Sequence, residues 1–240
     1  SRSAGASGAA PTTAKARFTL PTELRNDIVR LEVNGQATAG GVQLLDDRFH
    51  RRQVGLISGE GVEDAQPLLS PLYYISRALS PFADVRQPRD ANAAIAIPQL
   101  IDDGASAIIM ADIGSLTSEV EDKVAKWVEN GGTLVRFAGP RLAGSRDSLV
   151  PVALRHGDRV LGGTMSWQKP QPRASFNAAS PFAGLAVPTD VVVRRQVLAE
   201  PDGALAAQAW AALADGTPLV TAAPSGKGWL ILFHVTADTS

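Results

Sequence analysis

The spacing of hydrophobic and polar residues changes along the chain, and each change marks a different kind of expected structure. Residues 17–46 alternate apolar and polar side chains in short runs, with the turn dipeptide Asn34-Gly35 between two of them, which predicts antiparallel strands. From residue 52, short apolar runs alternate with stretches of helical periodicity, which is typical of a parallel sheet covered by helices. The proline-rich stretch at 140–182 is expected to be irregular, with short strands near Val152 and Gly163–Trp167. The strands expected after it predict an antiparallel meander that closes the fold.

The first expected helix begins at Ser70-Pro71, because serine caps free N–H groups and proline fits the first helical position. Its expected buried stripe consists of Leu72, Ile75, Leu79 and Phe82. The other expected helices cover 92–103 and 119–130, and the expected strands cover 54–57, 83–86, 105–110, 133–137, 191–198, 206–213, 218–223 and 229–235.

The helix expected at 119–130 has the clearest signals in the chain. Ser118 and Glu121 have the spacing of a capping box, and Gly131-Gly132 follows the last turn. Two pairs of opposite charge four residues apart, Glu119–Lys123 and Asp122–Lys126, are expected to support it. These signals predict a helix–strand unit that leads into residues 133–137.

Composition narrows the function classes. The 240 residues include 23 Lys+Arg and 24 Asp+Glu, a net charge of −1, which argues against a nucleic-acid partner. There is no cysteine, so disulfides, thiolate metal sites and a cysteine nucleophile are excluded. His50, His156 and His234 lie far apart without metal-ligand spacing, and neither a metal nor a cofactor is expected. No apolar run approaches the roughly 18 residues of a membrane span.

The N-terminal part is expected to be poor in structure of its own. Residues 1–16 contain almost no apolar bulk, which predicts a disordered tail or linker. The β segment at 17–46 has too few apolar residues to fold alone, and it is interpreted as the remnant of an upstream β domain. The abrupt start and end of the patterned region predict a piece of a longer protein.

Candidate chemistry is expected at the carboxyl ends of the parallel strands, where open α/β sheets bind ligands. Asp112 is the residue most open to two interpretations, because it is either a catalytic acid or a carboxylate that caps the next turn. Gly55, Gly59 and Gly61 do not have the spacing of a phosphate-binding loop. The expected ligand crevice comprises Ser58, Gly59, Glu60, Asp112, Gly114, Ala138, Gly139, Arg141 and His234.

Two stretches resemble the class I glutamine amidotransferase-like fold. They are residues 107–135, with Trp127-Val128 followed by Gly131-Gly132 and a strand, and the closing hairpin at 215–233. The resemblance covers roughly 52–138 and 205–237. It implies a flavodoxin- or Rossmann-like three-layer parallel sheet over 50–240, preceded by the small β segment and finished by the antiparallel meander.

The resemblance fails where catalysis would begin. It implies a cysteine nucleophile in the turn after the strand at 133–137, but Ala138 stands there, or Gly139 if the register shifts by one. His234 follows Phe233 as in the family, yet no Pro-Glu pair comes after it. We therefore expect a non-catalytic module that binds a protein partner or a small ligand. Two alternatives stay open: a hydrolase that uses Asp112, Glu60 and His234 in the crevice, and a structural spacer without a pocket.

A second resemblance concerns the setting of the module. Residues 18–26, 66–74 and 232–238 resemble the middle portion of bacterial membrane proteins with a BatA-type (aerotolerance-regulator) N-terminal region and a C-terminal domain of unknown function. This implies a soluble segment flanked by membrane-anchored regions of the same protein and facing the periplasm.

Overall fold

The computed structural model describes residues 15–16, 18, 20, 24, 27–36, 38–46, 51–59, 70–88, 90, 92–155, 164–176, 178–186 and 191–237. The chain divides into two compact units, residues 1–51 and 52–240. Within these described residues, no helix is both long and apolar enough to cross a membrane.

The first unit contains a β-hairpin. Strands β1 (Arg30–Glu32) and β2 (Val42–Leu44) pair antiparallel, and the short 3-10 helix η1 (Ala39–Gly41) leads into β2. Gly35, next to Asn34 in the expected turn, has a left-handed φ of 83°. All six strand residues are exposed, and an isolated two-stranded hairpin is at best marginally stable in water.

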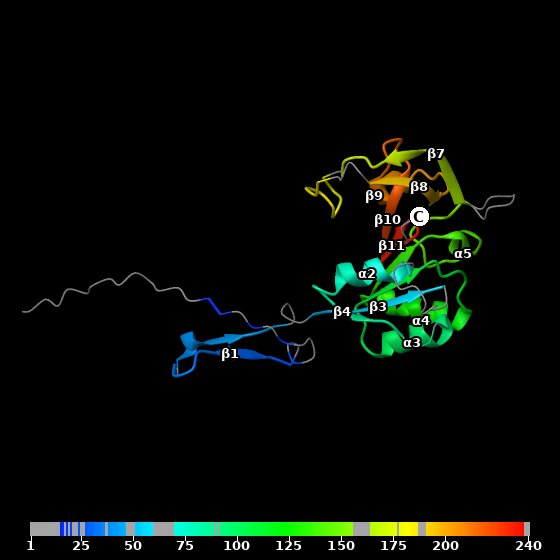
Figure 1. The fold of residues 1–240 in the computed structure, drawn as a ribbon. Helices are drawn as coiled ribbons and strands as arrows, with labels where there is room; N and C mark the ends of the chain where they lie inside the picture. Colours follow the sequence, from blue (N-terminus) through cyan, green and yellow to red (C-terminus); the bar gives the residue numbers. More distant parts are fainter. Residues whose placement is uncertain are drawn as a thin grey trace, which may run out of the picture. The chain divides into compact units, whose positions relative to one another are not determined.

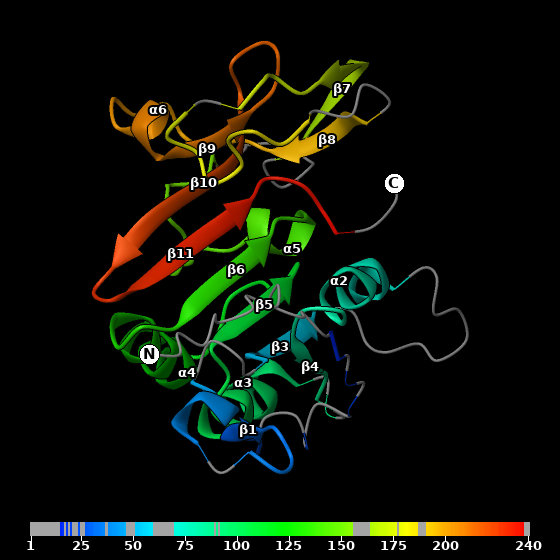
Figure 2. The same ribbon diagram turned by 90° about the vertical axis from the view of Figure 1, so that its left-hand side faces the viewer.

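The second unit is built on a seven-stranded sheet with the order β4-β3-β5-β6-β11-β10-β9 (Figures 1 and 2). Its strands are β3 (Gln53–Ser58), β4 (Asp84–Arg86), β5 (Ala107–Ala111), β6 (Thr133–Phe137), β9 (Ala209–Ala212), β10 (Pro218–Ser225) and β11 (Gly228–Phe233). The strands β4, β3, β5, β6 and β11 are parallel, and β10 is antiparallel to both β11 and β9. Taken in chain order, the parallel strands have the flavodoxin-like arrangement 2-1-3-4-5. The expected α/β class is confirmed.

Helices cover both faces of the parallel part. They are α2 (Pro71–Leu79), α3 (Ala93–Asp102), α4 (Ser118–Glu129) and the short α5 (Pro140–Ala143). On β5, Ile108 and Met110 pack into a core cluster with α3 and α4, whereas Ile109 and Ala111 pack with α2. Alternate residues of a buried strand point to opposite faces, so an uninterrupted apolar run is required here.

The helix ends agree with the sequence at α2 and differ at α4. The Ser70 hydroxyl accepts a hydrogen bond from Leu72 N at 3.3 Å, as expected of an N-cap. The capping box expected from Ser118 and Glu121 is wrong, because Thr117 is the N-cap of α4 and makes no side-chain cap bond. The carboxylate of Glu121 instead accepts a hydrogen bond from the Ser148 hydroxyl.

Two further expectations about the helices are also corrected. Phe82 is 78% exposed, because α2 ends at Leu79 and the helical stripe does not extend to it. Among the ion pairs of the described residues, Lys123 contacts Asp102 of α3 at 2.8 Å rather than Glu119 on its own helix.

The meander is shorter than expected. Strand β8 (Val192–Val197) does not join the main sheet but pairs with β7 (Thr164–Pro172) in a separate two-stranded sheet. The first half of the strand expected at 206–213 is the short helix α6 (Leu205–Gln208), and only its second half is the strand β9. Strand β7 corresponds to the strand expected near 163–167 and is longer than expected, because it continues to Pro172.

Candidate binding site at the carboxyl edge of the sheet

The strand ends lie in a row, as the sequence predicts. The amide of Gly59 donates to Ala111 O at 2.9 Å, Asp112 N donates to Phe137 O at 3.0 Å, and Ala138 N donates to Phe233 O at 2.9 Å. The residue that follows each strand therefore donates a backbone hydrogen bond to the last residue of the neighbouring strand in the sheet. The backbones of Gly59, Asp112, Ala138 and His234 accordingly occupy neighbouring positions at one edge of the sheet.

Asp112 caps the helix that follows β6. Its Oδ1 accepts hydrogen bonds from Arg141 N and Leu142 N, both at 3.0 Å, in the first turn of α5. Its own backbone is left-handed, with φ at 46°, a conformation that aspartate tolerates better than most residues. Asp112 therefore acts as a cap, but it caps the first turn of α5 rather than the turn that follows its own strand.

Gly139 makes room for this carboxylate. A Cβ at residue 139 would lie 2.6 and 2.7 Å from the two carboxylate oxygens of Asp112. Gly139→Ala is expected to lower the free energy of unfolding by about 1–3 kcal/mol, because the cap and the added methyl group cannot occupy the same space. Urea denaturation measures this loss. Gly203→Ala is the matched control, because a Cβ there has no neighbour within 4 Å, and a loss equal in both variants would contradict the assignment.

Two glycines of the expected crevice, Gly59 and Gly114, lie close to Arg141. A Cβ on Gly59 would lie 2.9 Å from the Arg141 guanidinium, and a Cβ on Gly114 would lie 3.3 Å from Arg141 O. Arg141 itself is exposed, and Ser58 is partly buried at the end of β3. Glu60, like His50 and His156, lies outside the described residues.

His234 is fully buried, and both of its ring nitrogens are engaged. Nδ1 lies 2.8 Å from Val197 O, and Nε2 lies 3.0 Å from Thr221 Oγ1. A carbonyl oxygen can only accept, so Nδ1 carries the proton and Nε2 accepts from the Thr221 hydroxyl. Burial lowers the pKa of His234 from 6.5 to about 4, and the Val197 carbonyl opposes that effect. The ring is therefore neutral at pH 7.

Thr221 and His234 have the atoms of a nucleophile and its base, and no motif in the sequence indicated such a pair on β10. Both side chains, however, have 0% of their surface exposed. A hydroxyl without solvent access cannot contact a substrate, so this pair has a structural role in joining β10, β11 and β8.

Ala138 occupies the turn between β6 and α5. Its side chain is 1% exposed and packs in a core cluster with Leu142, Leu154 and Leu232. The nearest hydroxyl that follows along the chain belongs to Ser145, which is buried and donates to Leu142 O at 2.9 Å. Neither Ala138 nor Gly139 offers a nucleophilic atom.

A buried ion pair lies beside this turn. Arg136 on β6 is 1% exposed, and its Nη1 contacts the carboxylate of Asp147, which is 4% exposed. Its Nη2 donates to Ile113 O at 2.5 Å. Asp147 Oδ1 also accepts from Leu149 N at 2.8 Å. The pair fixes the segment after α5 to the centre of the sheet.

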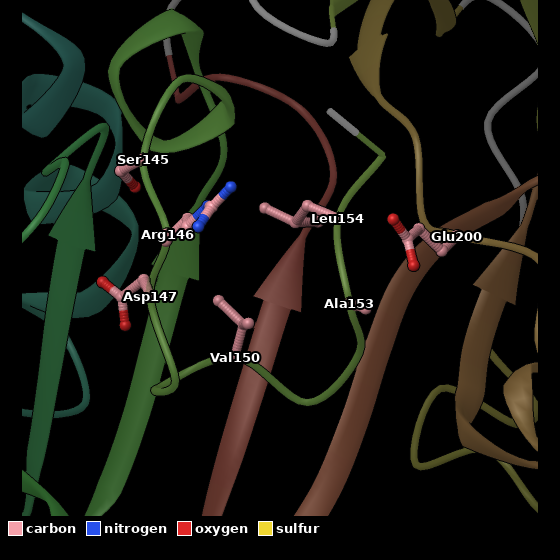
Figure 3. A pocket seen from close by; sticks show the side chains of 7 residues that line it. All are labelled: Ser145, Arg146, Asp147, Val150, Ala153, Leu154 and Glu200. Atoms are coloured by element: carbon pink, nitrogen blue, oxygen red, sulfur yellow. The ribbon is translucent and has the colours of Figure 1, made fainter. Parts of the chain in front are cut away.

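A pocket of about 170 Å³ opens in the segment that this ion pair holds (Figure 3). Glu200, which lies beyond β8, forms one side of the pocket. The other lining residues lie in the connection after α5: Ser145, Arg146, Asp147, Val150, Ala153 and Leu154. None of them belongs to the crevice expected from the sequence. Leu154 connects the two regions, because it also packs with Ala138 at the end of β6. Within the described part of the chain, no three His, Cys, Asp or Glu side chains gather as a metal site would require.

No protein-family model and no curated protein matches this sequence. Solved structures do match. The cytoplasmic protein STM3548 from Salmonella typhimurium is 17% identical, with a TM-score of 0.53 over 78% of this chain and 89% of that one. The chain therefore shares its α/β fold with STM3548. At this identity, the likeness shows the fold and not an activity.

Two further matches have lower scores. A putative ThuA-like protein from Bacteroides uniformis is 14% identical, with a TM-score of 0.48 over 78% of this chain and 82% of that one. A β-galactosidase from Halorubrum lacusprofundi is 16% identical, with a TM-score of 0.44 over 80% of this chain and 28% of the enzyme.

Proposed function

We propose that this chain is a non-catalytic binding module on an amidotransferase-like scaffold. The observation that carries the proposal is the buried Ala138 in the turn between β6 and α5, where the family resemblance implies a cysteine nucleophile. The complete burial of His234 and Thr221 supports it, because a base and a nucleophile must both be within reach of a substrate. The pocket at Arg146 and Glu200 favours a binding role over a plain spacer.

The setting of the module is part of the same proposal. The resemblance to BatA-type membrane proteins supports a module carried by a membrane-anchored protein and exposed to the periplasm. The balanced charge of the chain favours a protein partner or a small ligand over nucleic acid. Protease accessibility of the tagged full-length protein in spheroplasts tests this location, and protection of the tag in intact spheroplasts would contradict it.

The absence of catalysis is tested by turnover of glutamine, of glutamate esters and of p-nitrophenyl acetate. We expect no turnover by the native chain and none by Ala138→Cys, because the restored thiol would have no available base. Circular dichroism confirms that each protein is folded. Turnover by the native chain that His234→Ala abolishes would overturn the proposal.

A further inference from the structure

We propose that the pocket between Arg146 and Glu200 binds a small zwitterion whose two charges are separated by an apolar segment. This inference rests on the proposed binding role and names the class of ligand. It concerns residues after α5 and β8, and Ala138, where the family resemblance implies chemistry, does not line the pocket.

The two charged walls of the pocket have opposite signs. Arg146 and Glu200 are both exposed, and neither forms an ion pair within the described part of the chain. Figure 3 shows the guanidinium and the carboxylate pointing toward each other across Leu154. A ligand carboxylate would bind Arg146, and a ligand ammonium would bind Glu200. Asp147 is not available to a ligand cation in the same way, because Arg136 and Leu149 N already bind its carboxylate.

The floor between the charges is apolar. Val150, Ala153 and Leu154 lie between Arg146 and Glu200 along the lining of the pocket. A methylene chain or a small aliphatic side chain is therefore the complement of this floor. An inorganic anion has no positive group to pair with Glu200, so the lining does not favour a phosphate or a sulfate.

The walls are held in place before any ligand arrives. The buried pair Arg136–Asp147 fixes the residue next to Arg146, and the Ser145 hydroxyl on its other side bonds Leu142 O. Glu200 N donates to Ala153 O at 2.8 Å, so the acidic wall is bonded to the apolar floor. A preformed pocket binds without the entropy loss of ordering its own segments.

The size of the pocket sets the scale of the ligand. A volume of about 170 Å³ lies below the roughly 300 Å³ at which sites for drug-sized ligands begin. The pocket therefore suits a ligand of a few carbon atoms.

A series of ω-amino acids tests the proposal, because it varies the separation of the charges at constant chemistry. The probes are glycine, β-alanine, γ-aminobutyrate and ε-aminocaproate, titrated against the whole chain with backbone amide NMR as the readout. We expect millimolar binding with an optimum at one chain length and shifts centred on residues 145–154 and 200. Caproate and hexylamine, each with a single charge, are expected to bind about fivefold more weakly than ε-aminocaproate.

Substitutions identify the pocket as the site. Arg146→Gln and Glu200→Gln are each expected to weaken the best probe about fivefold, whereas the exposed controls Arg77→Gln and Glu119→Gln leave it unchanged. Equal binding of the single-charge analogues, no effect of the pocket variants, or no shift at tens of millimolar probe would each overturn the zwitterion assignment. None of these results touches the proposed absence of catalysis, which turnover alone decides.

Discussion

Replacing Arg136 by methionine while Asp147 stays in place is expected to lower the free energy of unfolding by about 3–5 kcal/mol. The reason is that the Asp147 carboxylate is 4% exposed and would be left in the interior without its partner. The substituted side chain has nearly the volume of the apolar part of arginine, so the loss is electrostatic and not due to a large cavity. Urea denaturation with a constant m value measures it.

A double-mutant cycle separates the interaction energy of Arg136 with Asp147 from the effects of each side chain on its other neighbours. Adding Asp147→Leu to Arg136→Met removes both charges and is expected to recover much of the loss, since apolar pairs often replace buried ion pairs without penalty. The surface pair Lys123–Asp102 is the matched control, because its side chains are 38% and 66% exposed. Lys123→Met is expected to change stability by less than about 1 kcal/mol.

A loss for Arg136→Met as small as that for Lys123→Met would contradict the assigned role of the buried pair. The same cycle bears on the pocket, since the pair anchors the segment that carries Arg146. If the double variant is stable, probe titration of that protein shows whether the apolar replacement still holds the segment in place.

The parallel part of the fold could be predicted because burial on both faces demands continuous apolar runs, as at Ile108, Ile109 and Met110. The strand that pairs with the last strand, β11, could not be predicted. Strand β11 pairs in parallel with β6, and Phe137 stacks on Phe233 at 4.5 Å between ring centroids. The periodicity of a strand shows its buried face and says nothing of which distant strand lies beside it.

The position of β8 shows the same limit. Its apolar residues predicted a strand correctly, but its place in a separate sheet depends on pairing with β7. A further hydrogen bond from Val197 N to His234 O at 2.8 Å attaches β8 to the end of β11. Such long-range backbone bonds have no local signal.

The sequence predicted which residues follow the parallel strands, but it did not predict the pocket at Arg146 and Glu200. The rule for strand ends brought Gly59, Asp112 and Ala138 together correctly. It could not show that Asp112 binds the first turn of α5, because capping and catalysis require the same carboxylate. Arg136 did carry a signal, since a charged residue within an otherwise apolar central strand is almost never buried without a partner. Its partner Asp147 lies in a stretch without periodicity and could not be named in advance.

Acidification is expected to destabilise the protein through His234. The unfolded chain binds a proton at this residue near pH 6.5, whereas burial lowers the pKa in the folded state to about 4. The neutral ring therefore contributes stability that is fully present above pH 6.5 and is lost as the pH falls from about 6.5 to about 4. The whole loss is about 3 kcal/mol. Urea denaturation at a series of pH values measures it.

His234→Gln isolates this effect, because glutamine does not titrate while carboxylates elsewhere titrate equally in both proteins. We expect the native chain to be the more stable protein at pH 7 and its advantage to shrink by about 3 kcal/mol at pH 4. The NMR resonance of the His234 ring is identified by its absence from the spectrum of the variant. In the native chain, this resonance should keep the chemical shift of a neutral imidazole down to about pH 4. Stability curves that run parallel between pH 7 and 4, together with a ring that titrates near 6.5, would show that His234 is reached by water. That result would also reopen its role as a base beside Thr221, because a substrate can enter only where water reaches the pair.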